Sequence, residues 1–139
     1  MVEASYLLDT NLLSEVVKSQ PNQRVLSNLK RNEHLLAIPS LVWHEMRYGW
    51  LKMPEGKRKQ AIGDYLHLVV SQLPVFDYDQ SAARVHAEFR AQLEKTGITL
   101  SFVDSQIAAI AIVNGLTLVT RNVTDYQAIP HLKMENWFD

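Results

Sequence analysis

Two kinds of apolar pattern alternate along this chain. Short apolar runs predict strands at 6–8, 35–38, 75–76 and 116–120, and a last short strand is expected near 133–135. Between these runs, apolar residues recur at spacings of three and four, which predicts helices over about 10–17, 21–29, 40–49, 62–73, 82–93 and 101–113. Strands that alternate with helices form a parallel sheet covered on both faces. We therefore predict the α/β class, with three α/β/α layers around a central, mainly parallel sheet of about 4–5 strands.

Capping residues mark the expected helix ends. Ser40 and Ser101 are placed to open helices, and Pro21 is placed to open the second helix of the chain. Gly97 suits the position just after a helix, where a left-handed backbone is common, and Asn114–Gly115 is expected to end the helix that begins at Ser101.

Length and composition indicate one small intracellular domain. At 139 residues, 47% of them apolar, the chain is long enough for a single domain over 1–139 with one sizeable core. It contains no cysteine, which excludes disulfides, zinc–thiolate sites and thiol catalysis. No leader pattern and no long apolar stretch suggest export or a membrane segment, so we expect a cytoplasmic protein.

The formal net charge of −1 is far from the basic balance of a typical nucleic-acid binder. A nucleic-acid substrate would need a local basic patch, for which Lys52 and the cluster Lys57-Arg58-Lys59 are candidates, together with metal ions that bridge to its phosphates. The alternative is that this cluster is only a solvated helix end.

Three carboxylates occupy positions that ordinary packing does not favour. Asp9 ends the first strand, at the sheet edge where ligands bind in open parallel sheets, although it could also serve only as a helix cap. Glu45 and Asp104 each fall on the apolar stripe of a predicted helix, where an unpaired carboxylate costs several kcal/mol. We therefore expect Asp9, Glu45 and Asp104 to form one acidic cluster whose mutual repulsion raises carboxyl pKa values.

Two further oxygen-bearing side chains follow the strand over 116–120. Asn122 stands at its exit and Asp125 three residues later, and both suit hard cations. For Asp125, capping of the short helix that follows is an equally good interpretation.

Other catalytic patterns are missing or incomplete. His44-Glu45 begins like the helix of zinc proteases, but Tyr48 stands where the second histidine is required. The chain has no G-x-S-x-G elbow and no Walker loop. His86 lies beside an apolar stripe, which favours a packed rather than a catalytic histidine.

Four segments together resemble the PIN-domain ribonucleases, and in particular the VapC-type toxins of bacterial toxin–antitoxin pairs, including FitB-like members. These segments are Leu8–Asn11, Trp43–Gly49, Phe102–Ala109 and Thr120–Tyr126. The resemblance implies a PIN-like fold and places the first three acids of the family on Asp9, Glu45 and Asp104. At the fourth site, where some members carry an acid, this chain has Asn122, with Asp125 available downstream.

The expected chemistry is metal-assisted hydrolysis of phosphodiester bonds. Mg²⁺ or Mn²⁺ would be held by Asp9 and Asp104, with Glu45 bound directly or through water, because carboxylates are hard oxygen ligands. The resemblance implies an endoribonuclease that inhibits growth through translation. The rival enzyme class, a phosphatase with Asp9 as nucleophile, needs a second aspartate where Asn11 stands. The rival without catalysis is a toxin–antitoxin-like interaction module whose acidic pocket receives a basic side chain.

The resemblance also implies two protein partners. The first is a VapB-like antitoxin, for which we expect an apolar groove lined by the early helices, with contributions from Leu12, Trp43, Trp50 and Met53. The second is another copy of the chain in a homodimer. Apolar surface for this homodimer is expected from Trp43, Tyr48, Ile62, Tyr65, Leu66, Val69 and Val70.

Overall fold

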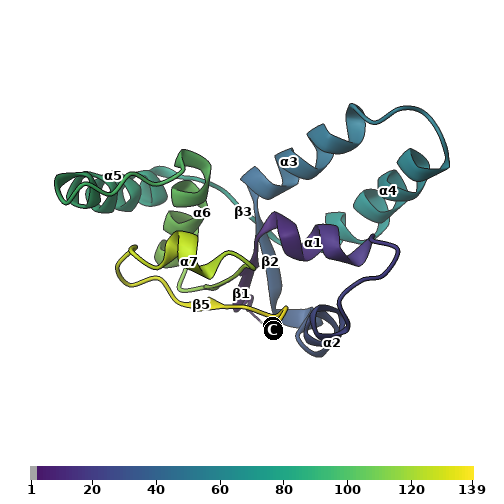
Figure 1. The fold of residues 1–139 in the computed structure, drawn as a ribbon, viewed down its shortest axis with the longest axis horizontal. Coiled ribbons are helices and arrows are strands. Elements are labelled where there is room, and N and C mark those ends of the chain that lie inside the picture. Colours follow the sequence, from purple (N-terminus) through teal and green to yellow (C-terminus); the bar gives the residue numbers. More distant parts are fainter. Residues whose placement is uncertain (1–2) are drawn as a thin grey trace.

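The computed structural model describes residues 3–139 and has a parallel sheet at its centre (Figure 1). The sheet has five strands in the order β3-β2-β1-β4-β5, and each neighbouring pair is parallel. The strands are β1 (Tyr6–Leu8), β2 (Leu36–Pro39), β3 (Val75–Phe76), β4 (Thr117–Val119) and β5 (Met134–Glu135). The predicted α/β class and parallel sheet are confirmed. From β1 the chain first builds β2 and β3 on one side, and then β4 and β5 on the other, so the strand order reverses between β1 and β4.

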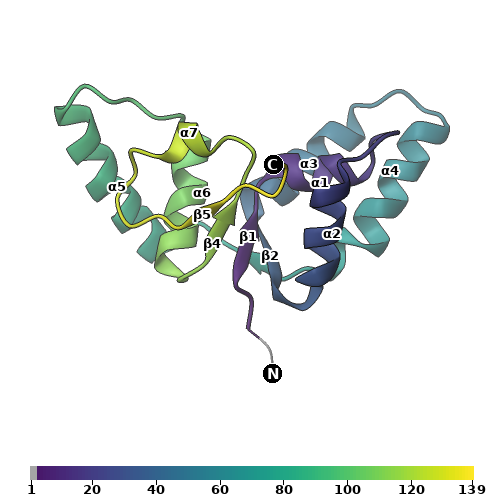
Figure 2. The same ribbon diagram turned by 60° about the horizontal axis from the view of Figure 1, so that its bottom comes forward.

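Helices lie on both sides of this sheet. Figure 2 shows α1 to α4 on one side of the strands and α5 to α7 on the other. Their bounds are α1 (Thr10–Val16), α2 (Gln23–Arg31), α3 (Ser40–Leu51), α4 (Lys57–Leu68), α5 (Gln80–Lys95), α6 (Phe102–Val113) and α7 (Val123–Tyr126). Two short 3₁₀ turns, η1 (Glu33–Leu35) and η2 (Val70–Gln72), precede β2 and β3. Within residues 3–139, no helix is both long and apolar enough to cross a membrane.

Most expected helix ends are confirmed, and the starts of α2 and α3 differ from expectation by one residue. Gly97 and Gly115 follow α5 and α6 with φ of 81° and 65°, the left-handed conformation that glycine adopts without strain. Pro21 does not open α2; Asn22 does, because its side chain accepts hydrogen bonds from the backbone N–H groups of Arg24 and Val25. The expectation that Ser40 caps α3 is wrong, because it is the first helical residue.

The helix predicted over 62–73 is interrupted. It ends at Leu68, and the chain continues through Val69 into the 3₁₀ turn η2. Val70 is fully buried in this turn, so tertiary packing keeps an apolar residue inside although the α-helical repeat has stopped.

Helices α3 and α4 approach closely at Gly63. The Trp50 indole N–H donates to the carbonyl of Lys59 at 2.9 Å, and a Cβ added to Gly63 would lie 2.8 Å from the same indole nitrogen. The side chain of Trp50 therefore fills the place where a side chain at residue 63 would begin.

We expect Gly63→Ala to destabilise the fold. Overpacking costs about 1–3 kcal/mol, which offsets or exceeds the gain of about 1 kcal/mol from replacing glycine within a helix. The matched control is Gly49→Ala in α3, where an added Cβ meets no atom within 4 Å, so unfolding free energy should stay the same or rise. Urea unfolding measures both variants, and a Gly63→Ala protein that is stabilised as much as Gly49→Ala would refute the close contact.

Candidate active site

Asp9 leaves β1 where the strand order reverses, and its carboxylate is 7% exposed. One oxygen, Oδ1, accepts a hydrogen bond from the Thr10 backbone N–H at 2.8 Å, so Asp9 caps α1. The other, Oδ2, accepts from the Thr120 hydroxyl at 2.9 Å and from the Tyr126 hydroxyl at 3.2 Å. The capping interpretation of Asp9 is therefore correct, and the same carboxylate also faces a site.

Thr120 and Tyr126 bring the far end of the chain to Asp9. Thr120 follows β4 and is fully buried, and Tyr126 lies in α7 with 1% of its surface exposed. Burial, together with the charges of Asp9 and Asp104, raises the pKa of Tyr126, so its hydroxyl stays protonated and donates. The sequence analysis did not assign these two residues a role. A sequence pattern that could have indicated them is a threonine directly after a strand, here Thr120, followed by a tyrosine in the next helix, here Tyr126.

Glu45 reaches the site from α3, but not from a buried position. The buried stripe of α3 runs through Val42 and Met46, a spacing of four residues, which leaves Glu45 exposed at its edge. Its carboxylate accepts a hydrogen bond from the Thr10 hydroxyl at 2.7 Å. The expectation of a carboxylate on the core stripe is wrong for Glu45, although the side chain does lie next to the Asp9 region.

Asp104 lies in the first turn of α6 and is partly buried. Desolvation by burial, and then the negative charge of Asp9, raise its pKa, and the charges of Asp125 and Glu45 add to this effect. The neighbouring Tyr126 hydroxyl acts in the opposite direction. Asp9, Glu45 and Asp125 are therefore all close enough for their charges to act on Asp104, whereas the closer approach of the three acids to one cation remains a prediction.

Two residues, Asn122 and Asp125, were the candidates for the fourth site of the family pattern. Asn122 is exposed at the N-terminus of α7, and its backbone N–H donates to the Thr120 hydroxyl oxygen at 3.1 Å. Asp125 is exposed in the first turn of α7 and does not cap this helix, because Asn122 occupies the cap position. The capping interpretation of Asp125 is therefore wrong.

One open cleft of about 400 Å³ gathers most of these side chains. Asp9, Glu45, Asp104 and Asn122 line it, whereas Asp125 influences the cleft only through its charge on Asp104. Their roles as catalytic residues and metal ligands remain predictions.

Two cationic side chains line the same cleft. Lys18 forms an ion pair with Glu15 at 2.9 Å, and the Arg121 guanidinium lies 4.6 Å from the centre of the Phe138 ring. The hydrogen bond from Lys18, followed by that from the Asn22 backbone N–H, lowers the pKa of Glu15. The cleft is therefore lined by both carboxylates and cationic side chains.

The donor set fits a hard divalent cation in its chemistry. Its candidate ligand atoms are carboxylate and amide oxygens. Burial, and then the neighbouring negative charges, raise the pKa of Asp104, and a bound cation would oppose both effects. As placed, however, no three acidic or histidine side chains of residues 3–139 converge closely enough to hold a metal ion. A cation held by Asp9, Glu45 and Asp104 together would therefore need side-chain positions other than those in this structure.

Comparison with known proteins identifies the family. The PIN domain family matches residues 6–129 of this chain. The chain therefore belongs to the PIN-domain family, as its four sequence segments suggested.

Within this family it is similar to VapC and FitB proteins. It is 32% identical over 134 residues to ribonuclease VapC2 of Rickettsia felis, covering 95% of this chain and 97% of the relative. It is 30% identical over 132 residues to the tRNA(fMet)-specific endonuclease VapC of Salmonella typhimurium (95% and 97% covered), and 30% identical over 142 residues to toxin FitB of Neisseria gonorrhoeae (96% and 99% covered).

Solved structures agree with this placement. FitAB bound to an IR36 DNA fragment superimposes with a TM-score of 0.88 at 26% identity, covering 96% of each chain. VapBC2 from Rickettsia felis bound to a promoter DNA fragment gives 0.82 at 30% identity, covering 98% of this chain and 99% of the other.

Proposed function

We propose that this chain is a metal-dependent endoribonuclease that acts as the toxin of a toxin–antitoxin pair. The observation that carries the proposal is the single cleft, at the reversal of strand order, that is lined by Asp9, Glu45, Asp104 and Asn122. Similarity to proteins named ribonuclease VapC2 and toxin FitB supports the reaction and the biological role. Because RNA is the substrate, the place of action is the cytoplasm, and inhibition of translation is the expected consequence.

Mg²⁺ or Mn²⁺ would be held by Asp9 and Asp104, with Glu45 bound directly or through water. When bound, such a cation lowers the pKa of a water molecule and stabilises the charge that develops on the phosphate. Hydrogen bonds from the Thr120 and Tyr126 hydroxyls fix the orientation of the Asp9 carboxylate. Glu45, exposed and held only by Thr10, is the acid that is free to adjust.

The substrate backbone is held by nearby cations. Lys18 and Arg121 line the cleft itself, and Arg58 lines the adjoining groove. The other candidate cation, Lys59, forms an ion pair with Glu55 at 2.8 Å and does not line the acidic cleft, and Lys52 lines only the adjoining groove, 4.6 Å from the Tyr48 ring centre. Phosphate contacts are therefore expected mainly beside the acids, where they compensate for the near-neutral charge of the whole chain.

The alternative is an interaction module without catalysis, whose acidic pocket receives a partner's basic side chain. Two observations favour it. The Asp9 carboxylate already accepts three hydrogen bonds from the protein, and the acids within residues 3–139 do not form a closed metal-binding group. A cleavage assay separates the two candidates.

Purified protein is expected to cleave RNA with Mg²⁺ or Mn²⁺ and to stop when EDTA removes the metal. Asp9→Asn or Asp104→Asn should lower the rate by at least about 100-fold, because loss of even an outer-shell partner of a metal site costs about 10–100-fold. The control is Asp64→Asn, an exposed carboxylate of α4 outside the cleft, which should cleave at the native rate. Cleavage that survives EDTA would refute the metal-dependent mechanism. If the native protein cleaves no RNA, the non-catalytic interaction module is the function that remains.

We place the antitoxin in a groove of about 690 Å³ beside the acidic cleft. Its apolar lining comes from α1, α3, the following loop and α4, with Val17, Met46, Trp50, Met53 and Ile62. It shares Thr10 and Glu45 with the cleft, so a basic side chain of a bound segment can reach the acids. Trp50 and Met53 lie where the sequence predicted, whereas Leu12 is fully buried and Trp43 does not line the groove. The structural relatives FitAB and VapBC2 are complexes, which supports such a partner.

Ile62→Glu should weaken binding of the cognate VapB-like protein by tenfold or more, about 1.4 kcal/mol or above, because a charge would enter an apolar contact. Leu68→Glu is the matched control: it lies on the same helix, is 72% exposed and does not line the groove, so it should bind normally. Titration calorimetry measures both. Equal affinities for the two variants would show that the partner binds another surface.

The homodimer remains a prediction, and its expected surface is smaller than the sequence indicated. Leu66 and Val70 are fully buried, and the Tyr65 hydroxyl donates to the carbonyl of Leu13. Of the expected set, Tyr48 and Val69 are exposed, at 57% and 54%. Additional exposed apolar surface lies at the start of α6, where Phe102 and Val103 are 52% and 46% exposed.

We therefore expect Val103→Asp to shift the protein from dimer to monomer, because a charge would enter the apolar contact. Light scattering at micromolar concentration measures this change. A native protein with a mass near 15.9 kDa and full ribonuclease activity would contradict the dimer as the working unit.

A further inference from the structure

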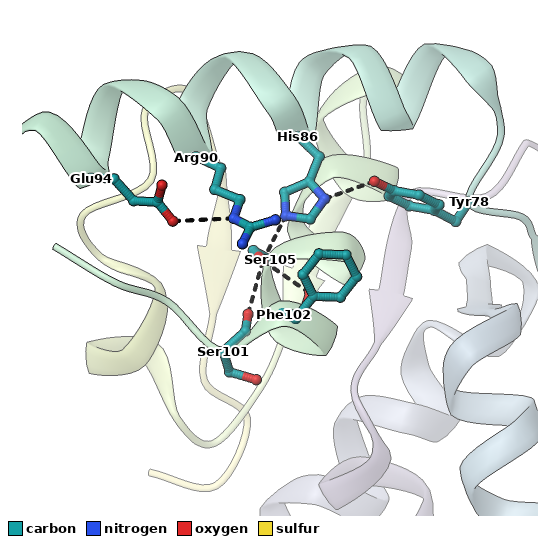
Figure 3. Close-up of polar contacts among 7 residues, drawn as sticks. All are labelled: Tyr78, His86, Arg90, Glu94, Ser101, Phe102 and Ser105. Atoms are coloured by element: carbon teal, nitrogen blue, oxygen red, sulfur yellow. Dashed lines mark hydrogen bonds and ion pairs between the residues drawn. The ribbon is translucent and has the colours of Figure 1, made fainter.

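A buried chain of polar groups joins α5 to the first turn of α6, outside the acidic cleft. Its centre is His86, which is 2% exposed. The ring nitrogen Nδ1 lies 2.7 Å from the Tyr78 hydroxyl, and Nε2 lies 2.8 Å from the Ser105 hydroxyl. Figure 3 shows the ring below α5 with Tyr78 on one side and Ser105 on the other. Nothing in the proposed mechanism uses this histidine.

The direction of each hydrogen bond in this chain is determined by Ser105. Its hydroxyl lies 2.8 Å from the Ser101 carbonyl and 2.9 Å from the Phe102 carbonyl, and these groups can only accept. The single Ser105 proton therefore points to the backbone, and its oxygen accepts from His86 Nε2–H. Nδ1 then carries no proton and accepts from the Tyr78 hydroxyl. Burial, assisted by the charge of Arg90, lowers the pKa of His86, which agrees with this neutral ring.

Aromatic contacts reinforce the same link. The His86 ring centre lies 5.4 Å from that of Phe89 on its own helix and 5.2 Å from that of Phe102, the first residue of α6. Arg90 of α5 lies 5.1 Å from the Phe102 ring centre, and its Nε donates to Glu94 at 3.2 Å. Helix α5 therefore holds the first turn of α6 through both polar and aromatic contacts.

Asp104 belongs to this turn, in which the Ser105 backbone N–H donates to the Ser101 carbonyl at 3.0 Å. The Asp104 backbone N–H has only a long contact of 3.5 Å with the capping Ser101 hydroxyl. Phe102 and Val103 are about half exposed, so they contribute limited burial. The first N–H groups of a helix lack intrahelical partners, and helix ends open more readily than their middles. The bond from His86 to Ser105 is thus a buried contact that ties the backbone next to Asp104 to α5, whereas Tyr126 contacts the Asp104 carboxylate itself.

We infer that His86 is a positioning residue that fixes the first turn of α6 and thereby the placement of Asp104 relative to Asp9. This inference rests on the proposed nuclease site, in which both acids hold the cation. His86 does not touch the reacting atoms; it acts through Ser105. A displacement of about 1 Å in an active site can cost about 100-fold in rate, so a fixed turn matters for catalysis.

The test compares two substitutions. His86→Phe keeps an aromatic ring against Phe89 and Phe102 but removes both hydrogen bonds. His86→Gln keeps an N–H donor within reach of Ser105. We expect His86→Phe to lower kcat by about 10–100-fold with little change in KM for RNA, and to raise the Mn²⁺ concentration needed for half-maximal rate. In His86→Gln, kcat and the Mn²⁺ concentration for half-maximal rate should both stay close to their native values.

A second readout does not depend on activity. Amide hydrogen exchange without metal should become faster at residues 104–106 in His86→Phe and return toward native values in His86→Gln. The control for general destabilisation is Tyr65→Phe, which loses a buried hydroxyl that donates to the Leu13 carbonyl at 3.0 Å, far along the chain from α6. It should lower the unfolding free energy but leave kcat and exchange at 104–106 unchanged.

The outcomes are distinct. Native kcat and native exchange at 104–106 in a folded His86→Phe protein would overturn the inference and leave His86 as a packing residue. If His86→Phe does not fold, Ser105→Ala removes the same bond from the other side, and it must give the same loss or the inference fails. If the native protein cleaves no RNA, the proposed function fails, while hydrogen exchange still decides whether His86 holds the turn.

Discussion

The carboxylate of Asp9 is removed from water at the one place in the sheet where the strand order reverses. A buried charge costs several kcal/mol unless it is hydrogen-bonded or paired, and here three donors satisfy it: the backbone of Thr10 and the hydroxyls of Thr120 and Tyr126. These donors come from α1, from the end of β4 and from α7. The hydrogen bonds to this one carboxylate therefore connect α1, the end of β4 and α7, which are far apart in the sequence. The other acids of the cleft are arranged around this connected region.

Around Asp9, the carboxylates of Glu45 and Asp104 line the same cleft, and among residues 3–139 neither forms an ion pair. Asp104 responds with a raised pKa, and Glu45 extends toward solvent at the border between the acidic cleft and the apolar groove. The same location explains both proposed ligands. A divalent cation relieves the repulsion and attracts phosphate, and a basic side chain of an inhibitor lying in the groove can replace that cation. In the proposed function, catalysis and inhibition thus depend on the same group of carboxylates.

Local sequence patterns were sufficient to predict the helices and strands, but they predicted the side-chain contacts between these elements less well. Strand positions, the helix-ending glycines Gly97 and Gly115, and the gathering of Asp9, Glu45 and Asp104 in one region were all predictable from spacing and capping. The burial of Glu45 was predicted wrongly, because apolar spacings of three and four do not fix which edge of a helical stripe is covered. The hydrogen bond from the Tyr126 hydroxyl to Asp9 joins residues 117 positions apart, and no local sequence pattern predicts such a contact. The sequence predicted that His86 is packed, but it did not identify its hydrogen-bond partners Tyr78 and Ser105. The contact with Ser105 exists only because α5 packs against α6 in the fold.

The central claim is that the acids around Asp9 hold a divalent cation, and a crystal grown with Mn²⁺ tests it most directly through anomalous diffraction. We predict an anomalous peak in the cleft with oxygen ligands from Asp9 and Asp104 at about 2.1–2.3 Å, with Glu45 bound directly or through water. The peak should disappear in Asp104→Asn crystals grown under the same conditions. A cleft without Mn²⁺ in the native protein, or a Mn²⁺ ion that persists unchanged in Asp104→Asn, would contradict a metal-dependent site built on these residues.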